Sequence, residues 1–169
     1  MSGVACGSPV AVTPEFEAGA DRIIARYPAS RRSASLMLLH YWQETHGHIS
    51  GSAVEWIAAK LGLQPINIEE LVSFYPMFRR ETFGKTHIRV CRTLSCMLGG
   101  APGTHAAFLE KTGATGDPHG PCHSPDGKYT VEYVECLASC GTAPVVMVND
   151  DFYEKVDAAA VEALLRKYS

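Results

Sequence analysis

This 169-residue chain contains six cysteines, whose thiolates can bind metals. Four of them form two pairs: Cys91 and Cys96 are spaced C-x4-C, and Cys136 and Cys140 are spaced C-x3-C. Four thiolates can hold either a zinc ion or an iron–sulfur cluster. Six cysteines are too few for a disulfide scaffold in a chain of this length, but they are enough for a metal site.

The spacing within each pair favours an iron–sulfur cluster over zinc, with disulfides and free thiols as further alternatives. Zinc sites most often use C-x2-C pairs, whereas a C-x4-C element also occurs in plant-type ferredoxins. A two-iron cluster distributes four thiolates over two metals, so longer loops suit it. Small and hydroxyl residues in these loops would let backbone N–H groups approach the sulfur atoms. They are Thr93, Ser95, Ser139, Gly141 and Thr142.

Strand patterns lead into both cysteine pairs. Residues 87–90 alternate as in a strand and run into Cys91, and residues 129–134 form a second strand that leads to Cys136. If these strands are neighbours, their loops bring four thiolates to one edge of a sheet. The other elements predicted in this half are a helix from about Pro102 to Gly113, strands over 145–148 and near 152–155, a turn over 149–151, and a last helix capped by Asp157.

The first half of the chain is predicted to be helical. Ser52 and Glu55 form a capping box at the start of one helix, and Ile66 and Leu71 are placed to clasp across the start of the next helix, at Asn67. The helices are predicted over about 14–27, 33–45, 52–61 and 67–75. We therefore expect a mobile tail over residues 1–13, a helical bundle over 14–83 and a second domain over 84–169.

Three segments, at residues 73–78, 90–101 and 135–144, carry a resemblance to a known family. In order and separation they resemble the thioredoxin-like 2Fe-2S subunit of bacterial NADH:quinone oxidoreductase (complex I). Small subunits of NAD-reducing hydrogenases and NAD-dependent formate dehydrogenases belong to the same family. The resemblance runs from about residue 15 to the end. It implies an α+β fold, with an N-terminal helical bundle followed by a thioredoxin-like 2Fe-2S ferredoxin domain with a mixed sheet.

The resemblance also implies a site and partners. Cys91, Cys96, Cys136 and Cys140 would bind one 2Fe-2S cluster, on a side branch of the electron path. The chain would be an electron-transfer subunit with no catalytic residue of its own. FMN and NADH are expected on a partner flavin subunit, and iron–sulfur subunits of the peripheral arm are expected as further partners. The equivalent subunit of a formate dehydrogenase or a hydrogenase is the alternative.

Three further places in the sequence have their own expectations. Ala138 stands where the family often has glycine, so a positive φ there would strain it. A cis bond is predicted before Pro144, as thioredoxin-like folds often have at such a place. The segment 116–124 looks unlike the usual connection: His119, Cys122 and His123 could form a second metal site, but a solvated loop is the better interpretation because a fourth ligand is lacking. Cys6 is predicted to be a free thiol in the tail.

Composition excludes several classes of function. Fifteen Lys and Arg against 18 Asp and Glu give a net charge of −3, so nucleic acid is not an expected partner. No apolar run approaches the roughly 20 residues of a membrane helix, so no direct membrane insertion is expected. The lack of a secretory signal favours the cytoplasm, with peripheral attachment at the inner membrane through partner subunits in complex I.

Three other kinds of site compete with the iron–sulfur interpretation. The glycines of residues 99–103 do not fit a dinucleotide fingerprint. A thioredoxin-type thiol oxidoreductase would need a C-x-x-C pair, which the chain lacks. A zinc-stabilised interaction module is the alternative from a different class.

Overall fold

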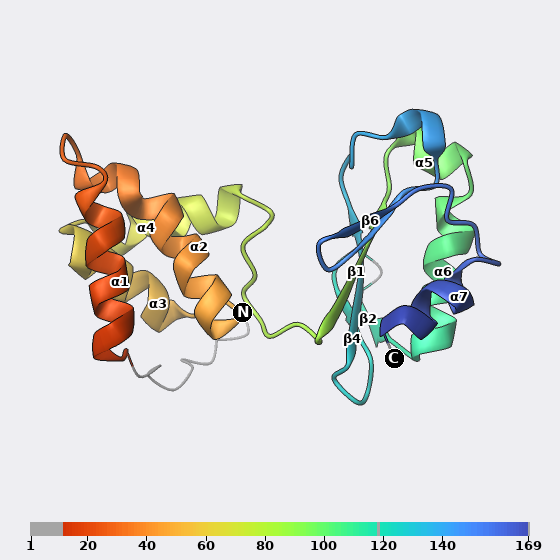
Figure 1. Ribbon diagram of the computed structural model, residues 1–169, viewed down its shortest axis with the longest axis horizontal. Coiled ribbons are helices and arrows are strands. Elements are labelled where there is room, and N and C mark those ends of the chain that lie inside the picture. Colours follow the sequence, from red (N-terminus) through yellow and green to blue (C-terminus); the bar gives the residue numbers. More distant parts are fainter. Residues whose placement is uncertain (1–11, 118, 169) are drawn as a thin grey trace. The chain divides into compact units, whose positions relative to one another are not determined.

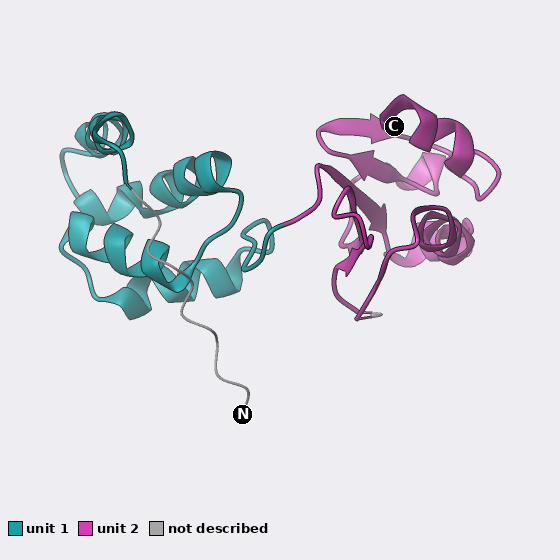
Figure 2. Ribbon diagram, turned by 90° about the horizontal axis from the view of Figure 1, so that it is seen from below, with its two compact units in different colours: residues 1–82 teal, residues 83–169 magenta. Residues whose placement is uncertain are grey.

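A computed structural model describes residues 12–117 and 119–168 (Figure 1). The chain divides into two compact units, residues 1–82 and 83–169 (Figure 2). Cys6 and most of the predicted mobile tail over residues 1–13 lie outside the described residues. Each unit has its own hydrophobic core, one around Trp42 and one around Phe108.

The first unit is built from helices, of which the last three end within one residue of the predicted positions, while the first ends at Ala25, before the predicted Tyr27. Gly47 and Gly62 adopt left-handed conformations, with φ of +83° and +71°, directly after two of the helices. The residue before Pro76 is extended, which ends the last helix at Phe74. The elements are α1 (Pro14–Ala25), η1 (Arg31–Ala34), α2 (Ser35–His46), α3 (Gly51–Leu61) and α4 (Pro65–Phe74).

Two predicted helix starts are wrong. The cap of α3 is Ser50, whose side chain accepts a hydrogen bond from the Ala53 N–H at 3.1 Å, and not Ser52. Helix α4 begins at Pro65, two residues before the predicted start, because proline suits the first position of a helix. Ile66 is therefore inside the helix and 65% exposed, so it does not form the predicted clasp.

The second unit contains a six-stranded sheet in the order β2-β3-β4-β1-β5-β6. The central strands β1 and β4 are parallel, and the other four pairs are antiparallel, so the sheet is mixed as predicted. The strands are β1 (Thr86–Cys91), β2 (Thr115–Gly116), β3 (Cys122–His123), β4 (Tyr129–Val134), β5 (Val146–Val148) and β6 (Asp151–Tyr153).

Helices α6 and α7 contact each other beside the sheet (Figure 1). Helix α6 begins next to Pro102 and stops before Gly113, as predicted. Asp157 accepts a hydrogen bond from the Ala160 N–H at 2.9 Å and so stabilises a turn, and the last helix starts only at Val161. The helical elements of this unit are α5 (Leu94–Leu98), α6 (Ala101–Thr112), η2 (Cys140–Thr142), α7 (Val161–Leu165) and η3 (Arg166–Tyr168).

Candidate metal centre

The two cysteine pairs meet at one edge of the sheet. Cys91 is the last residue of β1, and Cys136 lies two residues after β4 ends. Cys91 stands opposite Val134 in the parallel pairing of the two strands. Because parallel strands point the same way, both chain segments leave the sheet at the same edge. The strand pattern predicted that both loops leave one edge of a sheet if the strands are neighbours, and the pairing confirms that β1 and β4 are neighbours.

The first cysteine pair is held by β1 and the short helix α5. Cys91 and Cys96 are buried, with 1% and 2% of their surface exposed. Thr93 precedes α5, and its hydroxyl lies 3.2 Å from the Cys91 Sγ. The sequence did not predict α5, because five residues are too few to show a helical period. This helix brings Cys96 back to Cys91, and the two thiols are hydrogen-bonded.

The two buried thiols differ in acidity. Burial raises the pKa of Cys96, and its hydrogen bond with Cys91 raises it further. Burial also acts to raise the pKa of Cys91, but hydrogen bonds from Thr93, from the Leu137 N–H and from Cys96 outweigh burial, so the pKa of Cys91 is lowered. Donors around a buried thiol stabilise its thiolate, which is the form that binds metals.

The second pair lies on an exposed loop. Cys136 is exposed, and Cys140 begins the turn η2. The Ala138 N–H donates to the Cys136 Sγ over 3.3 Å. Ala138 has a φ of +62°, so the conformation that favours glycine is present at an alanine. Such a residue costs about 1–2 kcal/mol.

A salt bridge joins the two cysteine loops at their bases. Arg92 directly follows Cys91, and Glu135 directly precedes Cys136. The Arg92 Nε lies 2.9 Å from the Glu135 Oε1, and the Nη2 lies 2.5 Å from the same oxygen. Both side chains are solvent-exposed, so the pair orients the loops more than it stabilises them.

The segment after the second cysteine pair contacts the first pair through its backbone. The peptide bond between Ala143 and Pro144 is cis, as predicted. The next residue, Val145, accepts a hydrogen bond from the Cys91 N–H at 3.1 Å. Its own N–H donates to the Cys96 thiol. Val145 therefore links the end of β1 with α5.

The donor set fits a two-iron cluster better than a single ion. The thiols are spaced C-x4-C and C-x3-C, whereas zinc sites most often use C-x2-C pairs. A 2Fe-2S cluster takes two thiolates per iron, and the thiols come in two pairs. Backbone N–H groups reach the sulfurs of Cys91, Cys96 and Cys136.

The three residues considered for a second metal site, His119, Cys122 and His123, have separate contacts in the described structure. Cys122 is 3% exposed, and its thiol donates to the Asp117 carbonyl at 3.5 Å. The His123 Nδ1 lies 3.0 Å from the Thr130 hydroxyl, and His119 is exposed. These three residues form no metal-binding group in the described part of the chain.

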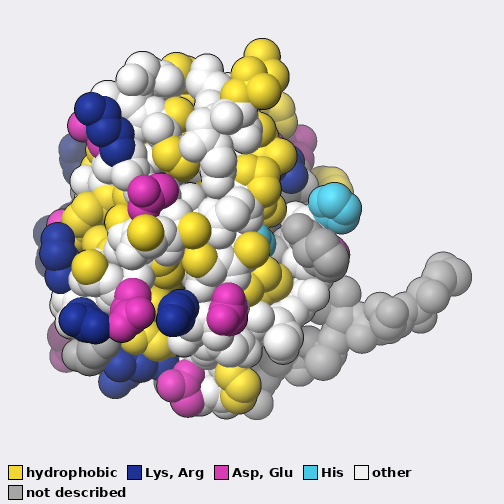
Figure 3. Space-filling view, turned by 90° about the vertical axis from the view of Figure 1, so that its right-hand side faces the viewer, with side chains coloured by type: hydrophobic (Ala, Val, Ile, Leu, Met, Phe, Trp, Pro, Cys, Tyr) yellow, Lys and Arg dark blue, Asp and Glu magenta, His cyan; other side chains and the backbone are white. Residues whose placement is uncertain are grey.

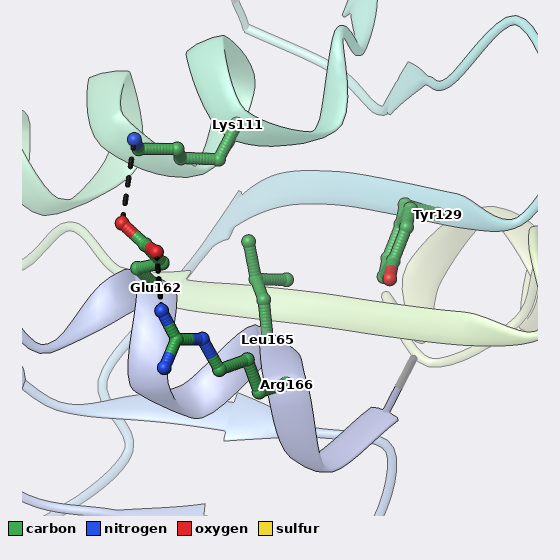
Figure 4. A pocket seen from close by; sticks show the side chains of 5 residues that line it. All are labelled: Lys111, Tyr129, Glu162, Leu165 and Arg166. Atoms are coloured by element: carbon green, nitrogen blue, oxygen red, sulfur yellow. Dashed lines mark hydrogen bonds and ion pairs between the residues drawn. The ribbon is translucent and has the colours of Figure 1, made fainter.

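A shallow cavity of about 330 Å³ lies elsewhere in the second unit (Figure 4). Tyr129 lines it and is the first residue of β4, so the cavity is at the opposite end of this strand from Cys136. Its two cations, Lys111 and Arg166, both pair with Glu162, at 3.6 and 2.6 Å. Since Glu162 already offsets these cations, the cavity does not have the chemistry of an anion site.

Hydrophobic side chains are exposed beside the cysteine loops. Leu94, Met97 and Leu98 of α5 are 75%, 43% and 82% exposed. Figure 3 shows hydrophobic side chains over much of one face, including its upper end, where Figure 1 draws α5, with charged side chains of both signs among them. The sequence did not indicate this surface, because α5 itself was not predicted. No helix in the described residues is long and apolar enough to cross a membrane.

A mixed sheet that carries two cysteine loops at one edge defines a class of small iron–sulfur electron carriers. The chain belongs to the thioredoxin-like [2Fe-2S] ferredoxin family, whose profile matches residues 20–169. The predicted α+β thioredoxin-like fold and the predicted 2Fe-2S cofactor are thereby confirmed.

The chain is similar to NADH-quinone oxidoreductase subunits over most of their length. It is 41% identical over 156 residues to an NADH-quinone oxidoreductase subunit of Rhizobium meliloti, covering 91% of this chain and 86% of the relative. It is 40% identical over 148 residues to "NADH-quinone oxidoreductase subunit 2" of Thermus thermophilus, covering 86% of this chain and 79% of the relative. These identities confirm the family that the three sequence segments indicated.

Among solved structures, the chain resembles an NAD+-reducing [NiFe]-hydrogenase in the air-oxidized state. The TM-score is 0.63 at 19% identity, and the match covers 78% of this chain but only 22% of the hydrogenase chain. This likeness concerns the fold alone.

Proposed function

We propose that this chain is the electron-transfer subunit that carries one 2Fe-2S cluster next to the flavin subunit of NADH:quinone oxidoreductase. The observation that carries the proposal is the meeting of two cysteine pairs at one sheet edge, in a chain 41% identical to a subunit of that enzyme. The cluster supplies one-electron redox chemistry, and the chain supplies its ligands and surroundings.

In this proposal Cys91, Cys96, Cys136 and Cys140 are the cluster ligands. The N–H groups of Leu137, Ala138 and Val145 donate to sulfur atoms of the first three. Such donors stabilise the added negative charge of a reduced cluster and so raise its potential. Two of the proposed ligands are buried and two are exposed, so the cluster would lie at the surface, where a partner can exchange an electron with it.

The partners in this proposal supply the rest of the reaction. FMN and NADH would bind to the flavin subunit, and iron–sulfur subunits of the peripheral arm would be further neighbours. The exposed side chains of Leu94, Met97 and Leu98 give the cysteine end an apolar rim suited to a protein contact. The chain would then lie on the cytoplasmic side of the inner membrane, attached through these partners.

The first test is chemical. The full chain, purified without oxygen, should contain two irons and two sulfides and give an EPR signal when it is reduced. Cys136→Ser should weaken or abolish that signal. Cys122→Ser is the matched control, because its hydroxyl can still donate to the Asp117 carbonyl, and it should keep the signal. Equal damage from both variants would contradict the ligand set, and a colourless protein with one zinc and no sulfide would establish the interaction module instead.

The second test identifies the complex. A tagged chain expressed in its own cells should co-purify with a flavin subunit and quinone-reducing activity. Co-purification with a formate dehydrogenase or a [NiFe] subunit would show that the chain serves one of those NAD-linked enzymes, since the cysteine pattern is common to the whole family.

A further inference from the structure

A single carboxylate holds the loop of the second cysteine pair. The Glu154 Oε1 accepts hydrogen bonds from the hydroxyls of Ser139 and Thr142, each at 2.5 Å. Ser139 directly precedes Cys140, and Thr142 ends the turn η2 that Cys140 begins. The hydrogen bonds come from residues 12 and 15 positions away in sequence, so no local pattern indicated them.

The two residues after Glu154 continue this contact through the backbone. The Lys155 N–H donates to the Thr142 carbonyl at 2.8 Å, and the Val156 N–H donates to the Pro144 carbonyl at 3.0 Å. The Val156 carbonyl accepts a hydrogen bond from the hydroxyl of Thr104, which is fully buried in α6. The loop is therefore attached to the body of the domain through residues 154–156.

The carboxylate and the two hydroxyls form one hydrogen-bonded group. The Ser139 and Thr142 hydroxyl oxygens lie 2.7 Å from each other as well as 2.5 Å from the Glu154 Oε1. A hydroxyl has one proton to donate, and within this group no hydrogen bond joins either hydroxyl to a sulfur atom. These hydrogen bonds lower the pKa of Glu154, and the side chain is ionised at neutral pH. Its negative charge therefore lies one hydrogen bond away from the residue next to Cys140.

We propose that Glu154 is a positioning residue for the 2Fe-2S cluster, which both retains the cluster by fixing the Cys140 loop and lowers its reduction potential. Hydrogen bonds from the loop to the carboxylate limit the opening of the loop, which slows loss of the cluster. The negative charge disfavours an added electron, and the occupied hydroxyls cannot stabilise one. This inference rests on the proposed function, because it takes Cys140 as a ligand.

Two variants of the full chain separate the two effects. Glu154→Gln keeps an oxygen that accepts hydrogen bonds but removes the charge, whereas Glu154→Ala removes both. The midpoint potential is measured by redox titration followed by EPR, and the rate of cluster loss is measured from visible absorbance after addition of an iron chelator. Glu162→Gln is the matched control, since it removes the same charge from an exposed residue that pairs with Lys111 and Arg166.

Both variants of Glu154 should have a more positive midpoint potential than the wild type. Glu154→Ala should also lose its cluster about 10-fold faster, a typical cost of removing a group that supports a metal ligand. Glu154→Gln should lose it at nearly the wild-type rate. The control Glu162→Gln should change neither quantity.

An unchanged potential in Glu154→Gln, or equal effects in Glu154→Gln and Glu162→Gln, would overturn the inference. The same holds if Glu154→Ala keeps the wild-type rate of cluster loss. If Glu154→Ala does not fold, the potential of Glu154→Gln still decides. Absence of a 2Fe-2S signal in the wild-type chain would instead overturn the proposed function, so the two failures can be told apart.

Discussion

At the residue scale, His105 combines burial with an incomplete set of hydrogen bonds. It is 6% exposed, and its ring stacks on Tyr133 with centroids 3.8 Å apart. Its Nε2 has no hydrogen-bond partner within the described residues. Burial lowers the pKa of His105, because a charged imidazolium would lose its hydration there.

We predict that His105 makes the protein less stable in mild acid. Its pKa is lower in the folded state, so the unfolded state binds more protons once the pH falls below about 6.5, and stability is lost from there downward. His105→Phe keeps the stacking and should reduce this loss by about 1.4 kcal/mol for each unit by which the pKa is lowered. Urea unfolding of the cluster-free chain between about pH 7 and 5 measures this loss of stability.

The control is His119→Gln, at an exposed position, which should show the same dependence of stability on pH as the wild type. If His105→Phe also showed the wild-type dependence, the prediction would be refuted.

The residues of the site differ in how far sequence alone could predict them. Residue type and spacing were enough to single out the four cysteines, and the resemblance to the family singled out Ala138, which stands where glycine is frequent. The contacts of Glu154 and the N–H of Leu137 could not be predicted, because they join residues that only the folded loops bring together. A backbone N–H donor in particular cannot be recognised from residue type, because every residue except proline has one.

At the scale of elements, the start of α3 shows why two serines cannot be told apart from sequence. Ser50 and Ser52 both precede the apolar stripe of the helix, and Glu55 three residues after Ser52 favoured the second one. In the structure Ser50 caps the helix, and Ser52 is its second residue. The Ser52 hydroxyl lies 2.8 Å from that of Ser50.

We therefore predict that replacing the two serines lowers the free energy of unfolding by different amounts. Ser50→Ala removes the acceptor for the Ala53 N–H and should lower the free energy of unfolding by about 1 kcal/mol. Ser52→Ala should change it by less than about 0.5 kcal/mol, since it loses only a contact between hydroxyls. Thermal or urea unfolding compares the two variants. A larger cost for Ser52→Ala would show that the capping box predicted from the sequence was correct.

Longer elements were predicted better than short ones. β1, β4 and α6 each span enough residues to show a period or a pair of end signals such as Pro102 and Gly113. The two-residue strands are set by their pairing, β2 with β3 and β3 with β4, rather than by their own sequence. α5 is also short, and the exposed residues beside the site lie on it.

At the scale of the whole molecule, the fold alone would not have identified the function. Thioredoxin-like domains serve several chemistries, and the site decides among them. Here the cysteine spacing in the second unit and segment 73–78 at the end of α4 belong together in one family, and the match over residues 20–169 spans both units. Both units therefore belong to the functional subunit, although all four proposed ligands lie in the second.

The proposed contact with a flavin subunit gives a prediction for the assembled complex. Leu98 is 82% exposed beside the cysteine loops, so burial against a partner would remove apolar surface from water. Leu98→Asp should weaken binding of the flavin subunit about 30-fold or more, the effect of a residue that contributes about 2 kcal/mol at an interface. The variant should still carry a full cluster, because the Leu98 side chain is 82% exposed, whereas Cys96 on the same helix is 2% exposed.

The control is Ala163→Asp, which places the same charge at an exposed position of α7 and should leave binding intact. Pull-down of the flavin subunit by cluster-loaded variants measures this, and normal binding by Leu98→Asp would mean that the partner docks on another surface.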